Sequence, residues 1–86
     1  MEAADSRAAR LPMTKADLER AAELYDEAAD ELDRAARHCK VAAGRFRDGN
    51  VPSGTAHAWA ALGHVREAEE RLDVQARQHR TKAQLD

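Results

Sequence analysis

The sequence predicts an all-α protein: a long antiparallel helical hairpin with an alanine-rich heptad seam, which dimerises into a four-helix bundle. Pairs of adjacent alanines recur every seven residues through the first half of the chain, and turn-forming residues gather near its middle. Of the 86 residues, 35% are charged and only 3% are aromatic. Large side chains are therefore too few for the core of one isolated hairpin, and we expect self-association.

The first helix is expected over about 14–47. Residues 1–12 show no sustained period and end at Pro12, so we expect a flexible arm there. Thr14 and Asp17 have the spacing of a capping box, with aspartate in place of the usual glutamate or glutamine. The helix should therefore begin directly after Thr14.

A heptad repeat of the coiled-coil type runs along this helix. The second alanine of each pair takes position a, and a larger residue follows three places later at position d. These positions form a seam of Leu18, Ala22, Tyr25, Ala29, Leu32, Ala36, Cys39, Ala43 and Phe46. Such a seam holds one face of a helix against its neighbour, so we expect the thiol of Cys39 to be a small buried hydrophobe.

A turn is expected over about 48–53, because Asp48-Gly49-Asn50 tolerates left-handed backbone geometry. Ser53 or Thr55 can cap the second helix, expected over about 54–82. A connection this short makes the two helices antiparallel. The second helix continues the self-association seam with Leu62, Val65, Leu72 and Ala76.

Charge is strongly segregated along the first helix. Residues 17–33 carry eight acids and one base, whereas residues 34–47 carry five bases and no acid. Folding at the turn places the acidic stretch beside the basic end of the second helix and leaves the turn end positive. The only tryptophan lies near this end, and an aromatic residue beside unneutralised arginines is typical of an interface. The expected partner-binding residues are Arg45, Arg47, His57, Trp59 and His64.

The sequence lacks the usual motifs of catalysis and metal binding. The sequence contains no Gly-rich phosphate loop, no Gly-x-Ser-x-Gly and no paired-histidine zinc motif. We therefore expect no enzyme activity, no catalytic residue and no cofactor. His38, His64 and Glu67 could form a metal site across the hairpin, but surface histidines are the preferred interpretation and no metal is predicted.

Composition also bears on location and function. A single cysteine, the lack of a long apolar run and the mixed-charge N-terminus predict a cytoplasmic protein without a membrane segment. We predict a non-enzymatic small interaction or regulatory protein that forms a homodimer and binds a protein partner. The alternative is a nucleic-acid-associated protein that uses the basic turn-proximal end, although the net charge of −2 provides no overall attraction.

A helical hairpin with a central turn resembles the Trp-x-Gly proteins exported by the type VII secretion system, over nearly the whole chain. The resemblance implies a further alternative, a secreted helical-hairpin protein. The motif residues differ, because the turn reads Phe46-Arg47-Asp48-Gly49 and Trp59 lies inside the second helix. No Tyr-x-x-x-Asp or Tyr-x-x-x-Glu export signal follows that helix.

Overall fold

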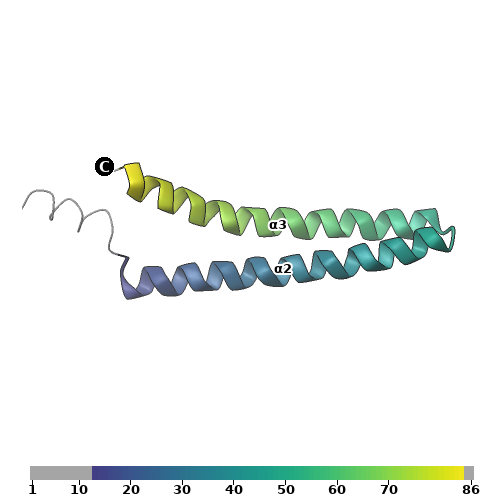
Figure 1. Cartoon of the computed structure of the whole chain (residues 1–86), viewed down its shortest axis with the longest axis horizontal. Helices are drawn as coiled ribbons and strands as arrows, with labels where there is room; N and C mark the ends of the chain where they lie inside the picture. Colours follow the sequence, from purple (N-terminus) through teal and green to yellow (C-terminus); the bar gives the residue numbers. More distant parts are fainter. Residues whose placement is uncertain (1–12, 85–86) are drawn as a thin grey trace, which may run out of the picture.

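The computed structural model describes residues 13–84 as two helices packed side by side (Figure 1). Helix α2 spans Lys15–Arg47 and helix α3 spans Val51–Gln84, and the chain reverses direction between them. The all-α helical hairpin predicted from the heptad repeat is confirmed. The arm expected over residues 1–12 lies outside the described residues.

The start of α2 is the capping box that the sequence predicts. The Thr14 hydroxyl accepts a hydrogen bond from the Asp17 backbone N–H at 3.0 Å. The Asp17 carboxylate in turn accepts one from the Thr14 backbone N–H, also at 3.0 Å. Two of the backbone donors that a helix start leaves unpaired are satisfied in this way.

The end of α2 is a left-handed glycine cap. Gly49 has a φ of +77°, a conformation that side chains with a Cβ rarely adopt. Its N–H donates to the Phe46 carbonyl at 3.0 Å, and the Asn50 N–H donates to the Arg45 carbonyl at 2.8 Å. This pair of hydrogen bonds is the Schellman arrangement, which ends the helix and turns the chain back.

Helix α3 begins at Val51, three residues earlier than expected. Its cap is Asn50, whose side-chain oxygen accepts the Ser53 N–H at 3.2 Å, so the expectation that Ser53 or Thr55 caps the helix is wrong. Pro52 fits inside the first turn because the N–H it lacks would have no partner there. The connection is correspondingly short, and the two helices remain close up to the turn.

The interior of the hairpin is built from small side chains. Its buried apolar residues are Leu24, Ala28, Ala35 and Ala42 on α2 and Ala61 and Ala68 on α3. Gly54 continues this row toward the turn, where a Cβ would lie 2.8 Å from the ring of Phe46. The largest fully buried side chain among the described residues is that of Gln75, which is polar. The hairpin alone therefore encloses little apolar volume.

The helices meet through the first alanine of each pair rather than the second. Ala28 and Ala35 are buried, whereas Ala29, Ala36 and Cys39 are exposed. Neighbouring residues lie about 100° apart around a helix, so a difference of one position moves the seam to another side. The interpretation of the seam as the contact within the hairpin, with a buried Cys39, is wrong. Its role in self-association stays a prediction.

Candidate interaction surface

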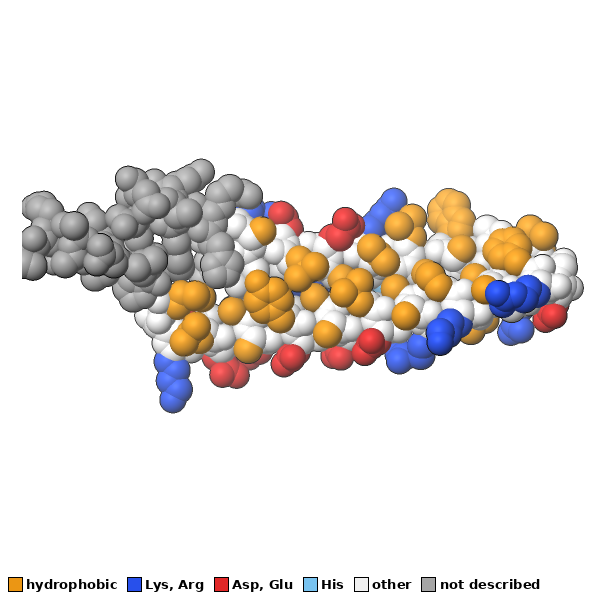
Figure 2. Space-filling model, viewed as in Figure 1, with side chains coloured by type: hydrophobic (Ala, Val, Ile, Leu, Met, Phe, Trp, Pro, Cys, Tyr) orange, Lys and Arg blue, Asp and Glu red, His pale blue; other side chains and the backbone are white. Residues whose placement is uncertain are grey.

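One side of the hairpin carries apolar side chains from both helices, and we call it the apolar face. Figure 2 shows these side chains as a band that runs along α2 and α3. All of the predicted seam residues belong to it, and all are exposed except the half-buried Ala43 and Val65. The apolar face thus consists of Leu18, Ala22, Tyr25, Ala29, Leu32, Ala36, Cys39, Ala43, Phe46, Leu62, Val65, Leu72 and Ala76.

Helix geometry explains why both seams reach the same side. On α2, Ala29 follows the buried Ala28 by one position, and on α3 Leu62 follows the buried Ala61 in the same way. Each step is a rotation of about 100° away from the helix contact. Because the helices run in opposite directions, the same rotation carries both residues to one side of the hairpin.

The large residues of the apolar face are open to solvent. The exposed fractions are 57% for Leu18, 47% for Tyr25, 45% for Leu32, 46% for Leu62 and 40% for Leu72. In contrast, Leu24 is the only leucine among the buried core residues. A contiguous exposed apolar surface of this kind is a candidate interaction surface.

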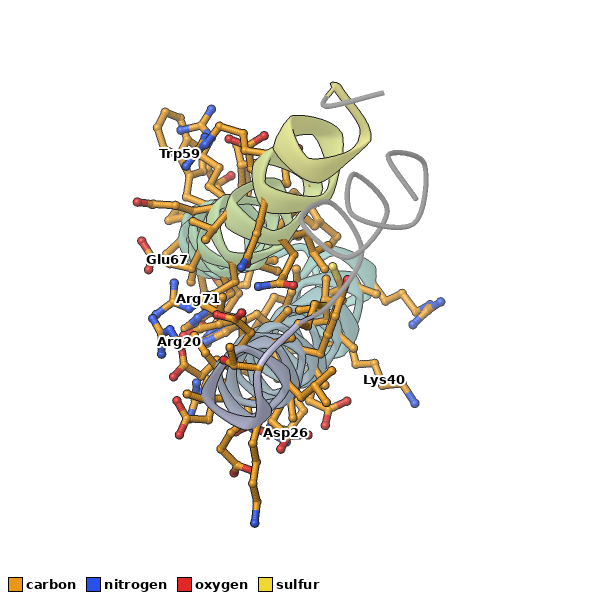
Figure 3. All side chains as sticks on the ribbon, turned by 90° about the vertical axis from the view of Figure 1, so that its left-hand side faces the viewer. Arg20, Asp26, Lys40, Trp59, Glu67 and Arg71 are labelled. Carbon is orange, nitrogen blue, oxygen red and sulfur yellow. The ribbon has the colours of Figure 1, made fainter. Side chains whose placement is uncertain are left out.

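The opposite side of the hairpin is charged. Arg20, Glu67 and Arg71 lie together there in Figure 3. The Arg71 guanidinium donates to Glu67 at 2.6 Å on its own helix and to Glu27 of α2 at 3.2 Å. These hydrogen bonds, led by the one to Glu67, raise the pKa of Arg71 above its usual value. This side therefore already carries an ion pair that joins the helices, between Arg71 and Glu27.

Two of the predicted partner-binding residues instead lie in the helix contact. His57 and His38 approach through their Nδ1 atoms at 3.0 Å, so one ring donates a hydrogen bond and the other accepts it. The ring of His38 also stacks on that of His64, with centroids 5.4 Å apart. His57 and His64 are thus half-buried between the helices rather than offered to a partner.

A carboxylate completes this row of polar groups. The Nδ1 atom of His64 lies 2.6 Å from a Glu31 carboxylate oxygen, which joins α3 to α2. This hydrogen bond lowers the pKa of Glu31 from its usual value, and the nearby charge of Arg34 lowers it further. Glu31 thus holds its charge at the edge of the contact, where α2 and α3 meet.

The alternative metal site is not assembled. His38 and His64 come together, but the carboxylate of Glu67 is bonded to Arg71. Within the described part of the chain, no three His, Cys, Asp or Glu side chains are placed to hold a metal ion.

The turn-proximal end retains three of the five predicted partner-binding residues, Arg45, Arg47 and Trp59, and we call this group the tip. The indole of Trp59 is 73% exposed and points away from α2 (Figure 3). Arg45 donates from Nε to the Ser53 hydroxyl at 3.1 Å, and Arg47 is exposed. The turn-proximal end therefore carries an exposed aromatic ring and exposed arginines, and their role in partner binding stays a prediction.

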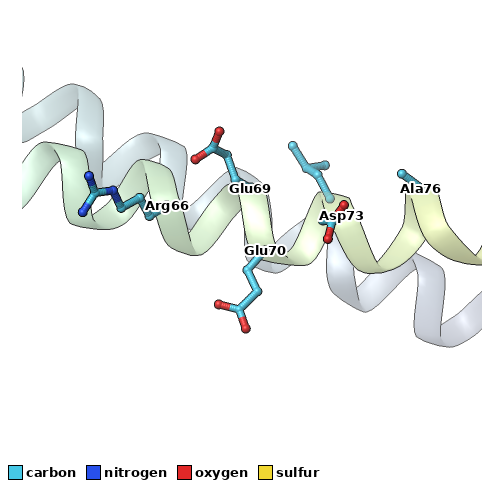
Figure 4. Close-up of a pocket in the computed structure, with 6 residues that line it drawn as sticks. Arg66, Glu69, Glu70, Asp73 and Ala76 are labelled. Atoms are coloured by element: carbon cyan, nitrogen blue, oxygen red, sulfur yellow. The ribbon is translucent and has the colours of Figure 1, made fainter.

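A shallow depression on α3 offers no comparable site. All of its lining residues belong to this single helix: Arg66, Glu69, Glu70, Leu72, Asp73 and Ala76. Figure 4 shows Glu69 and Glu70 pointing in opposite directions, so their carboxylates do not converge on a ligand. Over the described residues, neither helix is both long and apolar enough to cross a membrane.

The sequence did not single out Glu31 as a residue between the helices, and it indicated His38 only as a candidate metal ligand. Glu31 and His38 each follow a buried alanine, Ala28 or Ala35, by three positions. That spacing is the sequence signal that could have identified them. A residue three positions after a buried alanine lies on the same side of the helix as that alanine, and so faces α3. Their hydrogen bonds to His64 and His57 of α3 align the two helices.

Neither a family model, nor a curated protein, nor a solved structure matches this chain.

Proposed function

We propose that this chain is a non-enzymatic, cytoplasmic interaction or regulatory protein that dimerises through its apolar face and binds a protein partner at its tip. The observation that carries the proposal is the exposure of the apolar face. Leu18, Tyr25 and Leu32 of α2 and Leu62 and Leu72 of α3 are each 40% exposed or more.

The composition of the hairpin contact supports self-association. Most helical stability in proteins comes from packing an apolar face, and isolated helices are marginal in water. Here the contact between α2 and α3 encloses one leucine and a row of alanines. The larger apolar side chains can leave water only when a second surface covers them.

A second copy of the hairpin suits this surface. The apolar face extends over both helices, so its complement is a flat apolar layer two helices wide. A twofold pairing of identical faces provides such a layer and gives a four-helix bundle. The same pairing leaves Trp59 and Arg45 of the tip in solvent, available for a partner with an acidic amphipathic surface.

Two charge substitutions test the dimer. Leu32→Glu introduces a charge into the apolar face, whereas Val41→Glu introduces one at a residue that is 37% exposed and outside that face. We expect sedimentation equilibrium to find wild type and Val41→Glu as dimers and Leu32→Glu as a monomer. The thermal midpoint of the wild type should rise with protein concentration. A monomeric wild type with a constant midpoint would refute the proposal.

Nucleic-acid binding is the second candidate. Arg37, Lys40 and Arg47 are exposed, and none forms an ion pair with another residue in the described range. Retention on immobilised DNA should then fall steeply with salt, because each neutralised phosphate releases counterions. Apolar docking of a protein partner lacks this steep dependence, so the salt slope separates the two candidates.

A further inference from the structure

A row of charged residues borders the apolar face along α2. Glu19, Asp26, Asp33, Lys40 and Arg47 recur every seven residues, and each follows a d residue of the apolar face by one position. All five are exposed, and none forms an ion pair with another described residue. We call this row the charged edge. Figure 2 shows acidic side chains along this border of α2, replaced by basic ones toward the turn.

Two twofold arrangements can bring a pair of apolar faces together. With the axis parallel to the helices, α2 lies over α3 of the second copy and both turns are at the same end. With the axis perpendicular to the helices, α2 lies over α2 of the second copy in the opposite direction. The two turns then lie at opposite ends of the bundle. Both arrangements bury the same apolar residues, so the choice depends on the residues that border them.

The charged edge distinguishes the two arrangements. With α2 over α2 and the twofold axis near the middle of the α2 part of the apolar face, which runs from Leu18 to Phe46, Glu19 lies near Arg47 of the second copy and Asp26 lies near its Lys40. The axis repeats both contacts. Asp33 falls near the axis and forms the only like-charged pair. With α2 over α3, residues 34–47, with five bases and no acid, face residues 51–67, in which Arg66 and Glu67 cancel. The acidic residues 17–33 then face residues 68–84, which carry four bases and three acids. In that arrangement the basic half of α2 finds no net opposite charge and the acidic half finds a net charge of only +1, so the attraction is weaker than with α2 over α2.

We propose that the dimer is antiparallel, with α2 of each copy packed on α2 of the other and the two tips at opposite ends of the bundle. This inference deepens the proposed self-association and rests on it. Exposed ion pairs contribute little to stability, but they select orientation when the apolar contact allows more than one. The two Trp59 rings then point to separate ends, so one dimer can bridge two partner molecules.

Paired spin labels test the orientation in the full chain. Ala16→Cys and Asp30→Cys are each made in a Cys39→Ala background, and both sites are exposed on α2. In the antiparallel dimer the labels at position 16 lie about 50 Å apart along the bundle, and those at position 30 about 10 Å, at 1.5 Å per residue. Equally short distances at both sites in a dimer would overturn the orientation alone. A monomeric wild type would overturn the dimer itself.

A charge exchange provides a second measurement that leaves Cys39 in place. Glu19→Lys with Asp26→Lys makes the charged edge largely basic, and Lys40→Glu with Arg47→Glu makes it acidic. In the antiparallel arrangement each variant repels itself and attracts the other. We expect the mixed dimer to form in preference to either homodimer by about tenfold or more at low ionic strength, and less at high salt. Statistical mixing would overturn the proposal.

Discussion

Replacing Ala35 by Leu tests whether the alanine contact is closely packed. Ala35 is 5% exposed, and leucine would add three carbons between α2 and α3. The nearest cross-helix hydrogen bonds lie one turn to either side, Glu31 to His64 at 2.6 Å and His38 to His57 at 3.0 Å. Separating the helices by about 1 Å would bring both distances outside the range of a hydrogen bond.

The expected cost combines two effects. Overpacking a well-packed site costs about 1–3 kcal/mol, and loss of the hydrogen bond between His38 and His57 adds about 0.5–1.5 kcal/mol. The free energy of unfolding should therefore fall by about 1.5–4.5 kcal/mol, with the lengthened contact of Glu31 as an additional unfavourable change. Urea unfolding followed by circular dichroism measures this difference.

Two matched variants on the same helix complete the experiment. Asp30→Leu introduces the same side chain at an exposed position and should be nearly neutral. Ala36→Leu changes the apolar face, so its effect should depend on protein concentration, whereas that of Ala35→Leu should persist at every concentration. If Ala35→Leu were tolerated as well as Asp30→Leu, the close alanine contact would be disproved.

Two further predictions concern pH and the tip. Because the hydrogen bond from His64 lowers the pKa of Glu31, the ionised carboxylate stabilises the folded state, and this contribution is complete above the usual carboxyl pKa of 4.5. The thermal midpoint of wild type should exceed that of Glu31→Gln at neutral pH, and the difference should disappear as the pH falls through the lowered pKa; a constant difference would contradict this linkage. At the tip, an acidic amphipathic peptide should shift the fluorescence of Trp59 to shorter wavelength as it covers the ring. A labelled peptide should lose binding to Trp59→Ala while sedimentation still reports the wild-type mass, and undiminished binding would place the partner site elsewhere.

The two helices and the cap at Thr14 could be predicted from the sequence alone. These features depend on local patterns: a seven-residue repeat, a capping box and a glycine after the last turn. The start of α3 was misplaced because Asn50 can both follow one helix and cap the next. Local spacing alone did not distinguish Asn50 from Ser53 as the cap.

The register of the contact could not be read from apolar residues alone. Adjacent alanines offer two seams one position apart, and the larger apolar residues Tyr25 and Leu32 favour the seam that includes them. The hairpin uses the other one, because Glu31 and His38 find polar partners on α3. Those partners are distant in the sequence. For the same reason, the sequence did not show that His57 and His64 lie between the helices and not at the tip.

The uniform size of the buried alanines has a consequence for alignment. The buried positions of α2 hold the same side chain every seven residues, at Ala28, Ala35 and Ala42. A displacement of α3 by seven residues, about 10.5 Å, would therefore again place alanine against alanine. Steric fit alone therefore permits several alignments of the two helices. The residues that are not alanine select one alignment. A displaced helix would separate Glu31 from His64, and it would remove the ring of Phe46 from its place against the backbone of Gly54.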